Sequence, residues 1–242
     1  MKTFGLTLVL MCLMAVPAAA QIPDEFTNLE LFPKDIGKRE LVSVMRQFAG
    51  ALGVRCNHCH VGPDNLEGMD FATDELEAKR VARAMMKMSD EINSNLMPTT
   101  GRDSLLRVRC VTCHRGVMKP EQLDDILSAA VEKDGIDGAV ARYRELREEY
   151  YGSGAYDFSV GPLNELAEKL AREKQDADGA IKALELNVEF HPEAAFSFMM
   201  LGQLHTMKGD KDAAVAAIER AIAIEPDNER AKAMLERVKA GE

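Results

Sequence analysis

The chain has 242 residues, a formal net charge of −10, 5% aromatic residues and no tryptophan. This acidic balance, without a basic stripe, argues against nucleic acid binding. The length suits two modules. Residues 21–120 carry 14 acidic and 14 basic side chains, whereas residues 121–242 carry 26 acidic and 15 basic ones. The negative charge therefore belongs to the C-terminal half, where it either keeps the protein soluble or steers a basic partner.

The first twenty residues have the pattern of a secretory leader. Lys2 supplies the positive start, Leu6 to Val16 is apolar, and small residues lead to a cleavage position near Ala20. The apolar run is too short to span a bilayer comfortably, and no other candidate span follows. We therefore expect an exported, periplasmic or otherwise extracytoplasmic protein with no transmembrane segment in its mature form.

Two amphipathic helices are predicted in the first module. Apolar residues at helical spacing from Leu41 to Leu52 form one stripe, and Gly53 is a natural end for that helix. A second helix is expected to begin near Asp74, with Glu77 as its capping-box partner, and to break at Asn93. Its stripe comprises Ala78, Val81, Met85, Met88 and Ile92.

A C-x-x-C-H motif follows each of these helices, as Cys56 to His60 and as Cys110 to His114. This motif is typical of covalent c-type haem attachment. Two thiols at this spacing can form thioethers to the two vinyl groups of the macrocycle, and the adjacent histidine becomes the proximal iron ligand. Disulfides or a zinc site are the alternatives. Haem is favoured because a disulfide framework would not need the histidines, and zinc sites of this kind usually belong to reduced compartments.

The motifs therefore predict two covalently bound haem c groups. The covalent attachment residues are Cys56, Cys59, Cys110 and Cys113, and the proximal iron ligands are His60 and His114. These four cysteines are all the cysteines that follow the predicted leader.

The residues after about Glu121 are predicted to form helical repeats. Positions from Phe198 to Pro226 match the tetratricopeptide pattern, and matching offsets occur one period earlier at Ala180, Leu184 and Pro192. A further helix over Ile136 to Tyr150 and a closing helix over Arg230 to Lys239 flank about two repeats. We thus expect an all-α protein with a leader over 1–20, a dihaem module over 21–120 and a repeat module over 121–242.

The distal iron ligands decide whether the irons are closed or open. Of the remaining histidines, His58 lies inside an attachment loop, and His191 and His205 fall in the repeat region, where packing roles are favoured. Methionines are plentiful, although a methionine stripe is more often simply core. Spacing favours Met45 for the first haem and leaves Met85, Met86 and Met88 open for the second.

The dihaem module resembles the cytochrome c subunit of the photosynthetic reaction centre and its non-photosynthetic relatives. The resemblance covers roughly Leu31 to Pro120 and rests on LVSVMRQFAGALGVRCNHCH, RAMMKMSDEIN and RCVTCHRG. In that family most haems follow a helix that carries an axial methionine, so the resemblance implies Met45 and Met85 as distal ligands. The family subunit has four haems and lacks the repeat tail, so the resemblance implies a two-haem relative rather than a donor to a photosynthetic special pair.

These features predict an electron carrier rather than an enzyme. Its partner would be a redox protein, either free or within a membrane electron-transfer complex, docked by the repeat module. One alternative is a dihaem peroxidase with one open iron, which would need a distal acid–base group. Another is a repeat scaffold whose haems are structural.

Overall fold

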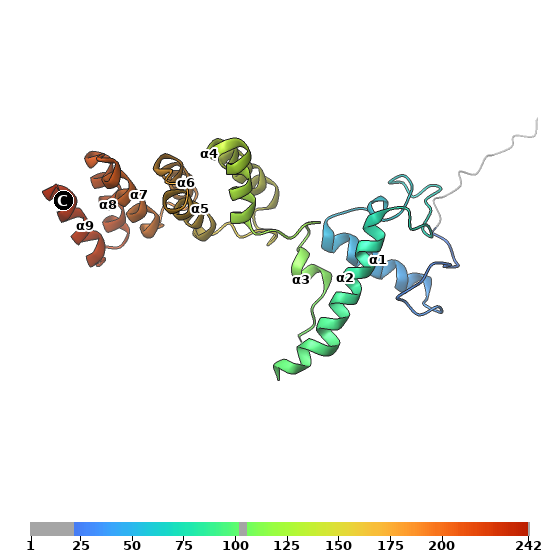
Figure 1. Cartoon of the computed structure of the whole chain (residues 1–242). Coiled ribbons are helices and arrows are strands. Elements are labelled where there is room, and N and C mark those ends of the chain that lie inside the picture. Colours follow the sequence, from blue (N-terminus) through green and yellow to red (C-terminus); the bar gives the residue numbers. More distant parts are fainter. Residues whose placement is uncertain (1–21, 102–105, 242) are drawn as a thin grey trace, which may run out of the picture. The chain divides into compact units, whose positions relative to one another are not determined.

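The computed structural model describes residues 22–101 and 106–241, which contain helices and no strands (Figure 1). One isolated antiparallel bridge joins Val61 and Asp70. The all-α expectation is therefore confirmed for the described chain. The predicted leader, Met1 to Ala20, lies outside the described residues. The chain divides into a first unit that ends at Cys113 and a second unit that begins at His114.

The first unit consists of two longer helices, short helical turns and loops. Its elements are α1 (Lys38–Leu52), the 3-10 turn η1 (Cys56–His58), α2 (Glu77–Glu91), the π-helical turn η2 (Ile92–Leu96), the 3-10 turn η3 (Met97–Thr100) and α3 (Cys110–His114), whose last residue opens the second unit. As predicted, α1 ends at Gly53. This glycine has a φ of 67°, the left-handed conformation that lets its N–H reach back to the last carbonyls of the helix.

α2 ends at Glu91, two residues before the break predicted at Asn93, and the chain continues in the π-helical turn η2 and the 3-10 turn η3 up to Gly101. The expected capping box at its start is wrong. Its N-cap is Leu76, which makes no side-chain cap, and Asp74 does not form a capping box with Glu77. Asp74 instead binds Arg83, Lys79 and Asn28, and these longer-range partners replace the local cap.

The second unit is a row of helices in which each contacts its neighbours (Figure 1). They are α4 (Leu123–Tyr150), α5 (Val160–Arg172), α6 (Ala177–Phe190), α7 (Ala195–Lys208), α8 (Lys211–Ile224) and α9 (Glu229–Ala240). Gly135, at φ 71° and ψ −174°, breaks the helical path inside α4. The predicted helix over Ile136 to Tyr150 is therefore the second arm of a longer, kinked helix.

Apolar burial in the second unit extends from α4 to α9 in two clusters. Leu127, Tyr143 and Leu184 are fully buried in one cluster, and Ile218 is fully buried in the next. The α7–α8 pair is close because Gly202 has no side chain: a Cβ there would overlap Ile218 Cγ1. Gly202 and Ile218 thus contact each other.

A small polar cluster joins α5, α6 and α7 inside this core. The Nδ2 of Asn187 donates to Asn164 Oδ1 at 2.8 Å and to the Val160 carbonyl at 2.9 Å. Ser197 Oγ donates to the same Asn164 oxygen at 2.7 Å. Because buried polar groups need specific partners, this cluster fixes the register of the three helices.

No helix in the described part of the chain combines the length and the apolar character needed to cross a membrane.

Candidate haem sites

The first motif forms a tight turn directly after α1. The N–H groups of Cys59 and His60 both donate to the Cys56 carbonyl, at 3.2 and 3.0 Å. Cys56, Cys59 and His60 therefore lie within a single turn of the backbone. Both thiols are free, with Cys56 exposed and Cys59 half-buried.

His60 lies against the loop that precedes α2. Its ring centroid is 5.1 Å from that of Phe71, and its Nδ1 is buried without a hydrogen-bond partner. Burial, and next the charge of Lys79, lower the pKa of His60. The neutral imidazole, which is the form that binds a metal, is therefore favoured.

Lys79 holds the loop beside His60 in place. Its Nζ donates to the carbonyls of Phe71, Ala72 and Thr73 at 3.0, 2.9 and 2.8 Å. The side chain is only 12% exposed. One amine thus fixes three consecutive peptide groups and, with them, the Phe71 ring next to His60.

Asp74 continues this network onto α2. Arg83 Nη1 bonds to Asp74 Oδ2 and to Glu30 Oε1, both at 2.9 Å, and Asn28 Nδ2 donates to Asp74 Oδ1 at 2.9 Å. The hydrogen bond from Arg83 is the largest cause that lowers the pKa of Asp74 to about 2. The N-terminal half of α2 is therefore tied by charge to the loop of the first motif.

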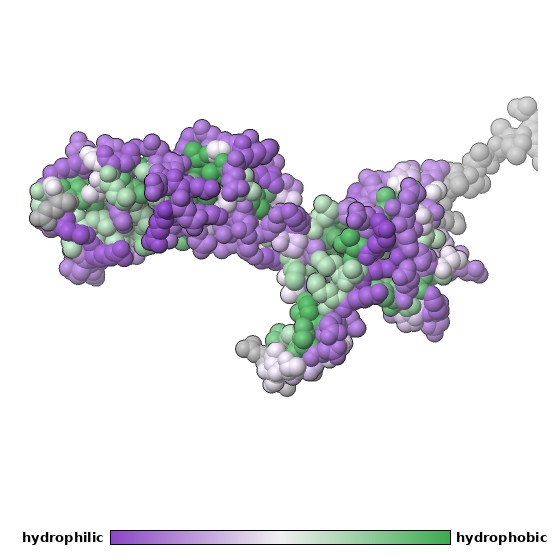
Figure 2. All heavy atoms as spheres, in the orientation of Figure 1, coloured by the Kyte–Doolittle hydropathy of each residue, from purple (hydrophilic) through white to green (hydrophobic). Residues whose placement is uncertain are grey.

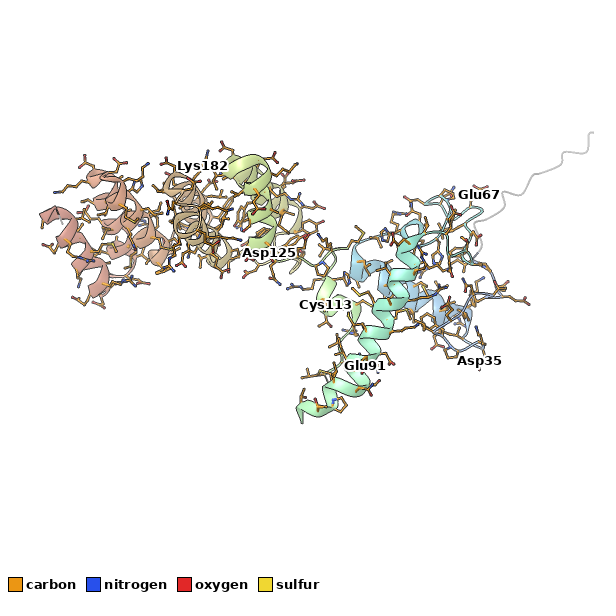
Figure 3. All side chains as sticks on the ribbon, viewed as in Figure 1. Asp35, Glu67, Glu91, Cys113, Asp125 and Lys182 are labelled. Carbon is orange, nitrogen blue, oxygen red and sulfur yellow. The ribbon has the colours of Figure 1, made fainter. Side chains whose placement is uncertain are left out.

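The second motif forms the short helix α3. The Arg109 N–H donates to Thr112 Oγ1 at 3.0 Å, and the Thr112 N–H donates to the Arg109 carbonyl at 2.8 Å, so the start of α3 is fixed by a reciprocal pair of bonds. Cys110 is half-buried and Cys113 is exposed, and both thiols are free (Figure 3).

His114 has a partner that sets its tautomer. Its Nδ1 lies 3.0 Å from the Val117 carbonyl. A carbonyl only accepts, so Nδ1 carries the proton and Nε2 keeps the lone pair that a metal needs. The turn that returns Val117 to His114 uses left-handed backbone at Arg115 (φ 49°) and Gly116 (φ 91°).

The predicted distal methionines lie on the two longer helices. Met45 is half-buried on α1, Met86 is half-buried on α2, and Met85 and Met88 are 39% and 48% exposed on α2. Met85 and Met88 share their exposed stripe with Val81. Helical spacing places Met86 on a different face of α2 from this stripe.

The first unit presents a large apolar surface suited to a flat cofactor. No residue of α2 is buried, although the helix has a strong apolar stripe. Figure 2 shows hydrophobic residues on the surface where Figure 1 draws α2 and α3. Two further exposed apolar side chains of this unit are Leu106, before α3, and Val111, within it. A haem attached to either motif would cover this kind of surface, so the residues present fit the group.

The four thiols of the two motifs are free in the structure. Within residues 22–101 and 106–241, no three His, Cys, Asp or Glu side chains converge as a zinc site would require. His191 and His205 lie in the second unit, at the C-cap of α6 and inside α7.

Sequence reasoning missed several residues that support the motifs. These residues contact the loops beside the motifs, and they are Phe71, Lys79, Arg83 and Asn93. Their contacts are a ring contact, side chain to backbone bonds, and an ion pair between residues that are distant in sequence. The basic residues on the polar face of α2 were the available signal, but their partners could not be read from spacing.

Comparisons with known proteins identify a family and two relatives. The family model described as "Photosynthetic reaction centre cytochrome C subunit" matches residues 17–144, more than half of the chain. A photosynthetic reaction center cytochrome c subunit from Roseobacter denitrificans is 37% identical over 68 residues, which are 28% of this chain and 18% of that protein. Cytochrome c-554 from Chloroflexus aurantiacus is 33% identical over 76 residues, 31% of this chain and 17% of that protein. The chain thus matches less than a fifth of the length of these two relatives.

Proposed function

Because the chain belongs to the photosynthetic reaction centre cytochrome C subunit family, we propose that it is an exported dihaem cytochrome c that carries electrons to or from a protein partner. The observation that carries the proposal is the pair of C-x-x-C-H turns together with the helix α2, none of whose residues is buried although it has an apolar stripe. A bound haem c supplies a one-electron Fe(III)/Fe(II) couple.

In this proposal the protein attaches, ligates and insulates the cofactors. Cys56 and Cys59 hold the first haem, and Cys110 and Cys113 hold the second. His60 and His114 are the proximal ligands, and the bond from His114 to the Val117 carbonyl orients its ring. Met45 and Met85 are the distal ligands. Ligation by methionine and histidine would raise the haem potential, and the apolar stripes would keep water away from the cofactors.

The test is spectroscopy of the purified holoprotein with single methionine variants. We expect a mass increase of two haems per chain, a methionine-to-iron charge-transfer band and no carbon monoxide binding. Met45→Ala and Met85→Ala should each remove about half of that band and open one iron to carbon monoxide. Met86→Ala and Met88→Ala are the matched controls on α2.

Two results would contradict this assignment. If Met88→Ala or Met86→Ala opens the second iron and Met85→Ala does not, Met85 is not the ligand. If the unmodified protein already binds carbon monoxide, one iron is open and the dihaem peroxidase becomes the better function.

A mature N-terminus far from Gln21, measured by mass spectrometry, would contradict export through the predicted leader.

The second unit, in this proposal a short tetratricopeptide-like array, docks a basic redox protein. Two observations support docking: the excess of acidic over basic side chains after residue 120, and the exposed Phe196 and Met207 at 51% and 71% on α7. These two residues are eleven positions apart and so share a face of the helix. Apolar anchors surrounded by charge are typical of transient interfaces.

Electron delivery to a basic cytochrome c, measured by stopped flow, tests the docking role. The rate should fall steeply with salt, because opposite charges steer the encounter. Phe196→Ala with Met207→Ala should lower the rate at least fivefold, while Val160→Ala, an exposed change on α5, should not. Equal rates for the unmodified protein, the double variant and Val160→Ala would refute docking through α7. A rate that does not depend on salt would refute charge steering.

A further inference from the structure

The side chain of Asn93 joins the end of α2 to the segment that enters the second motif. Its Nδ2 donates to the Val108 carbonyl at 2.8 Å, and its Oδ1 accepts the Val108 N–H at 2.8 Å. The amide thus pairs with both polar groups of a single residue, as a neighbouring β-strand would. The two residues are fifteen positions apart in sequence.

The orientation of this amide is fixed by its surroundings. Nδ2 also donates to the Ser89 carbonyl at 2.8 Å. Val108 offers one donor and one acceptor, and Ser89 offers an acceptor, so only one placement of oxygen and nitrogen satisfies all three bonds. Both N–H groups of the amide are then used, and the side chain is held from two elements at once.

The location of Asn93 ties this bond to the cofactor site. Asn93 is the second residue of η2, the π-helical turn that directly follows α2, and turns of this kind are frequent at functional sites. Val108 lies two residues before Cys110, and the intervening Arg109 is itself bound to Thr112. Figure 3 labels Glu91, the last residue of α2, and Cys113 on α3, the two elements that Asn93 connects.

Neither an aspartate nor a leucine can make the same contacts. An aspartate would keep the bond from the Val108 N–H but would set a carboxylate oxygen against the Val108 and Ser89 carbonyls. A leucine would leave the N–H and the carbonyl of Val108 without this partner, and an unmade bond at a partly buried group is costly. The contact therefore requires an amide at this position.

We propose that Asn93 is a positioning residue for the second haem: it sets the distance between α2, which carries the candidate distal methionines, and α3, which carries Cys110, Cys113 and His114. This inference rests on the proposed function. Its consequence is that loss of Asn93 loosens the methionine–iron bond at the second haem while both haems stay covalently attached.

The experiment uses the full-length holoprotein with Asn93→Leu, Asn93→Asp and the control Asn95→Leu. Asn95 lies in the same turn, but it is exposed, and its side-chain amide bonds to Glu91 Oε2, at 2.7 Å, on the same helical segment. The readouts are the mass of each protein, carbon monoxide binding, and the pH at which the methionine-to-iron band is lost. A purely structural role elsewhere in the unit would not alter the band of one haem alone.

We expect two haems per chain in every variant. One iron of Asn93→Leu should bind carbon monoxide, with an affinity at least tenfold above that of Asn95→Leu. Half of the methionine-to-iron band of Asn93→Leu should be lost at a lower pH than in Asn95→Leu. Asn93→Asp, which keeps one of the three bonds, should show the same change. If both Asn93 variants have the same methionine band and the same carbon monoxide affinity as Asn95→Leu, the inference is overturned. The proposed function would not be affected by that result. An unmodified protein with a single haem would instead overturn the proposed function.

Discussion

The two units of the chain bury their apolar side chains in different ways. In the second unit the helices cover one another, and Leu127, Tyr143 and Leu184 are fully buried. In the first unit α1 buries only Leu41 and Ala51, and α2 buries nothing. Polar bonds such as those of Lys79 and Asn93 hold the first unit together instead. An apolar stripe without a protein partner is thus itself a sign of a cofactor site.

The strongest test of this contrast removes covalent haem attachment. Replacing Cys56, Cys59, Cys110 and Cys113 by serine should abolish cooperative folding of the first unit, since helices of fifteen residues with an uncovered apolar face are marginal in water. The second unit should stay folded. Hydrogen exchange measured by mass spectrometry checks this: amides of α1 and α2 should exchange rapidly and those of α5 to α8 slowly. Equal protection of α2 and α5 would contradict the contrast.

A cavity in the second unit should have the opposite effect. Leu184→Ala removes a fully buried side chain and should lower the free energy of unfolding of that unit by about 2–5 kcal/mol. The haem spectrum should not change, because the first unit does not share this core. Urea unfolding followed by far-ultraviolet circular dichroism gives the loss, with the exposed Met207→Ala as control. A shifted haem spectrum would show that the two units are not independent.

Overpacking the α7–α8 pair should cost less. Gly202→Ala places a methyl group against Ile218 and should destabilise the second unit by about 1–3 kcal/mol. Gly161→Ala is the matched control on α5, because a Cβ there makes only an ordinary contact of 3.6 Å with Ser159 Oγ. Equal melting temperatures for the two variants would show that Gly202 is not needed for close packing.

The smallest expected effect is a pH dependence in the first unit. The pKa of Asp74 is lowered to about 2, mainly by the hydrogen bond from Arg83. The ionised carboxylate therefore stabilises the fold fully at pH values above the usual carboxyl pKa. This stabilisation is lost as the pH falls through about 2. Asp74→Asn should therefore lower the melting temperature at pH 6 and have little effect near pH 2. Asp64→Asn, whose partner Arg55 is exposed, is the control. A difference between Asp74→Asn and the unmodified protein that is constant from pH 6 to pH 2 would contradict this.

Local patterns could be predicted from the sequence, and distant partners could not. The stripe from Leu41 to Leu52, the end of α1 at Gly53 and the helical character of both units follow from periodicity and glycine placement. The capping-box prediction at Asp74 was wrong because Arg83, nine residues away, competes for the same carboxylate. The break predicted at Asn93 lies two residues beyond the end of α2, but the bond from its amide to a peptide group fifteen residues away could not be predicted.

Lys79 has a consequence for chemical labelling of the protein surface. Its amine is enclosed by three carbonyls and the Asp74 carboxylate, whereas the side chains of Lys119 and Lys133 are 74% and 81% exposed. An acylating reagent should therefore modify those two lysines long before Lys79. The point at which Lys79 becomes reactive would report when the loop around His60 opens, without any need to observe the haem.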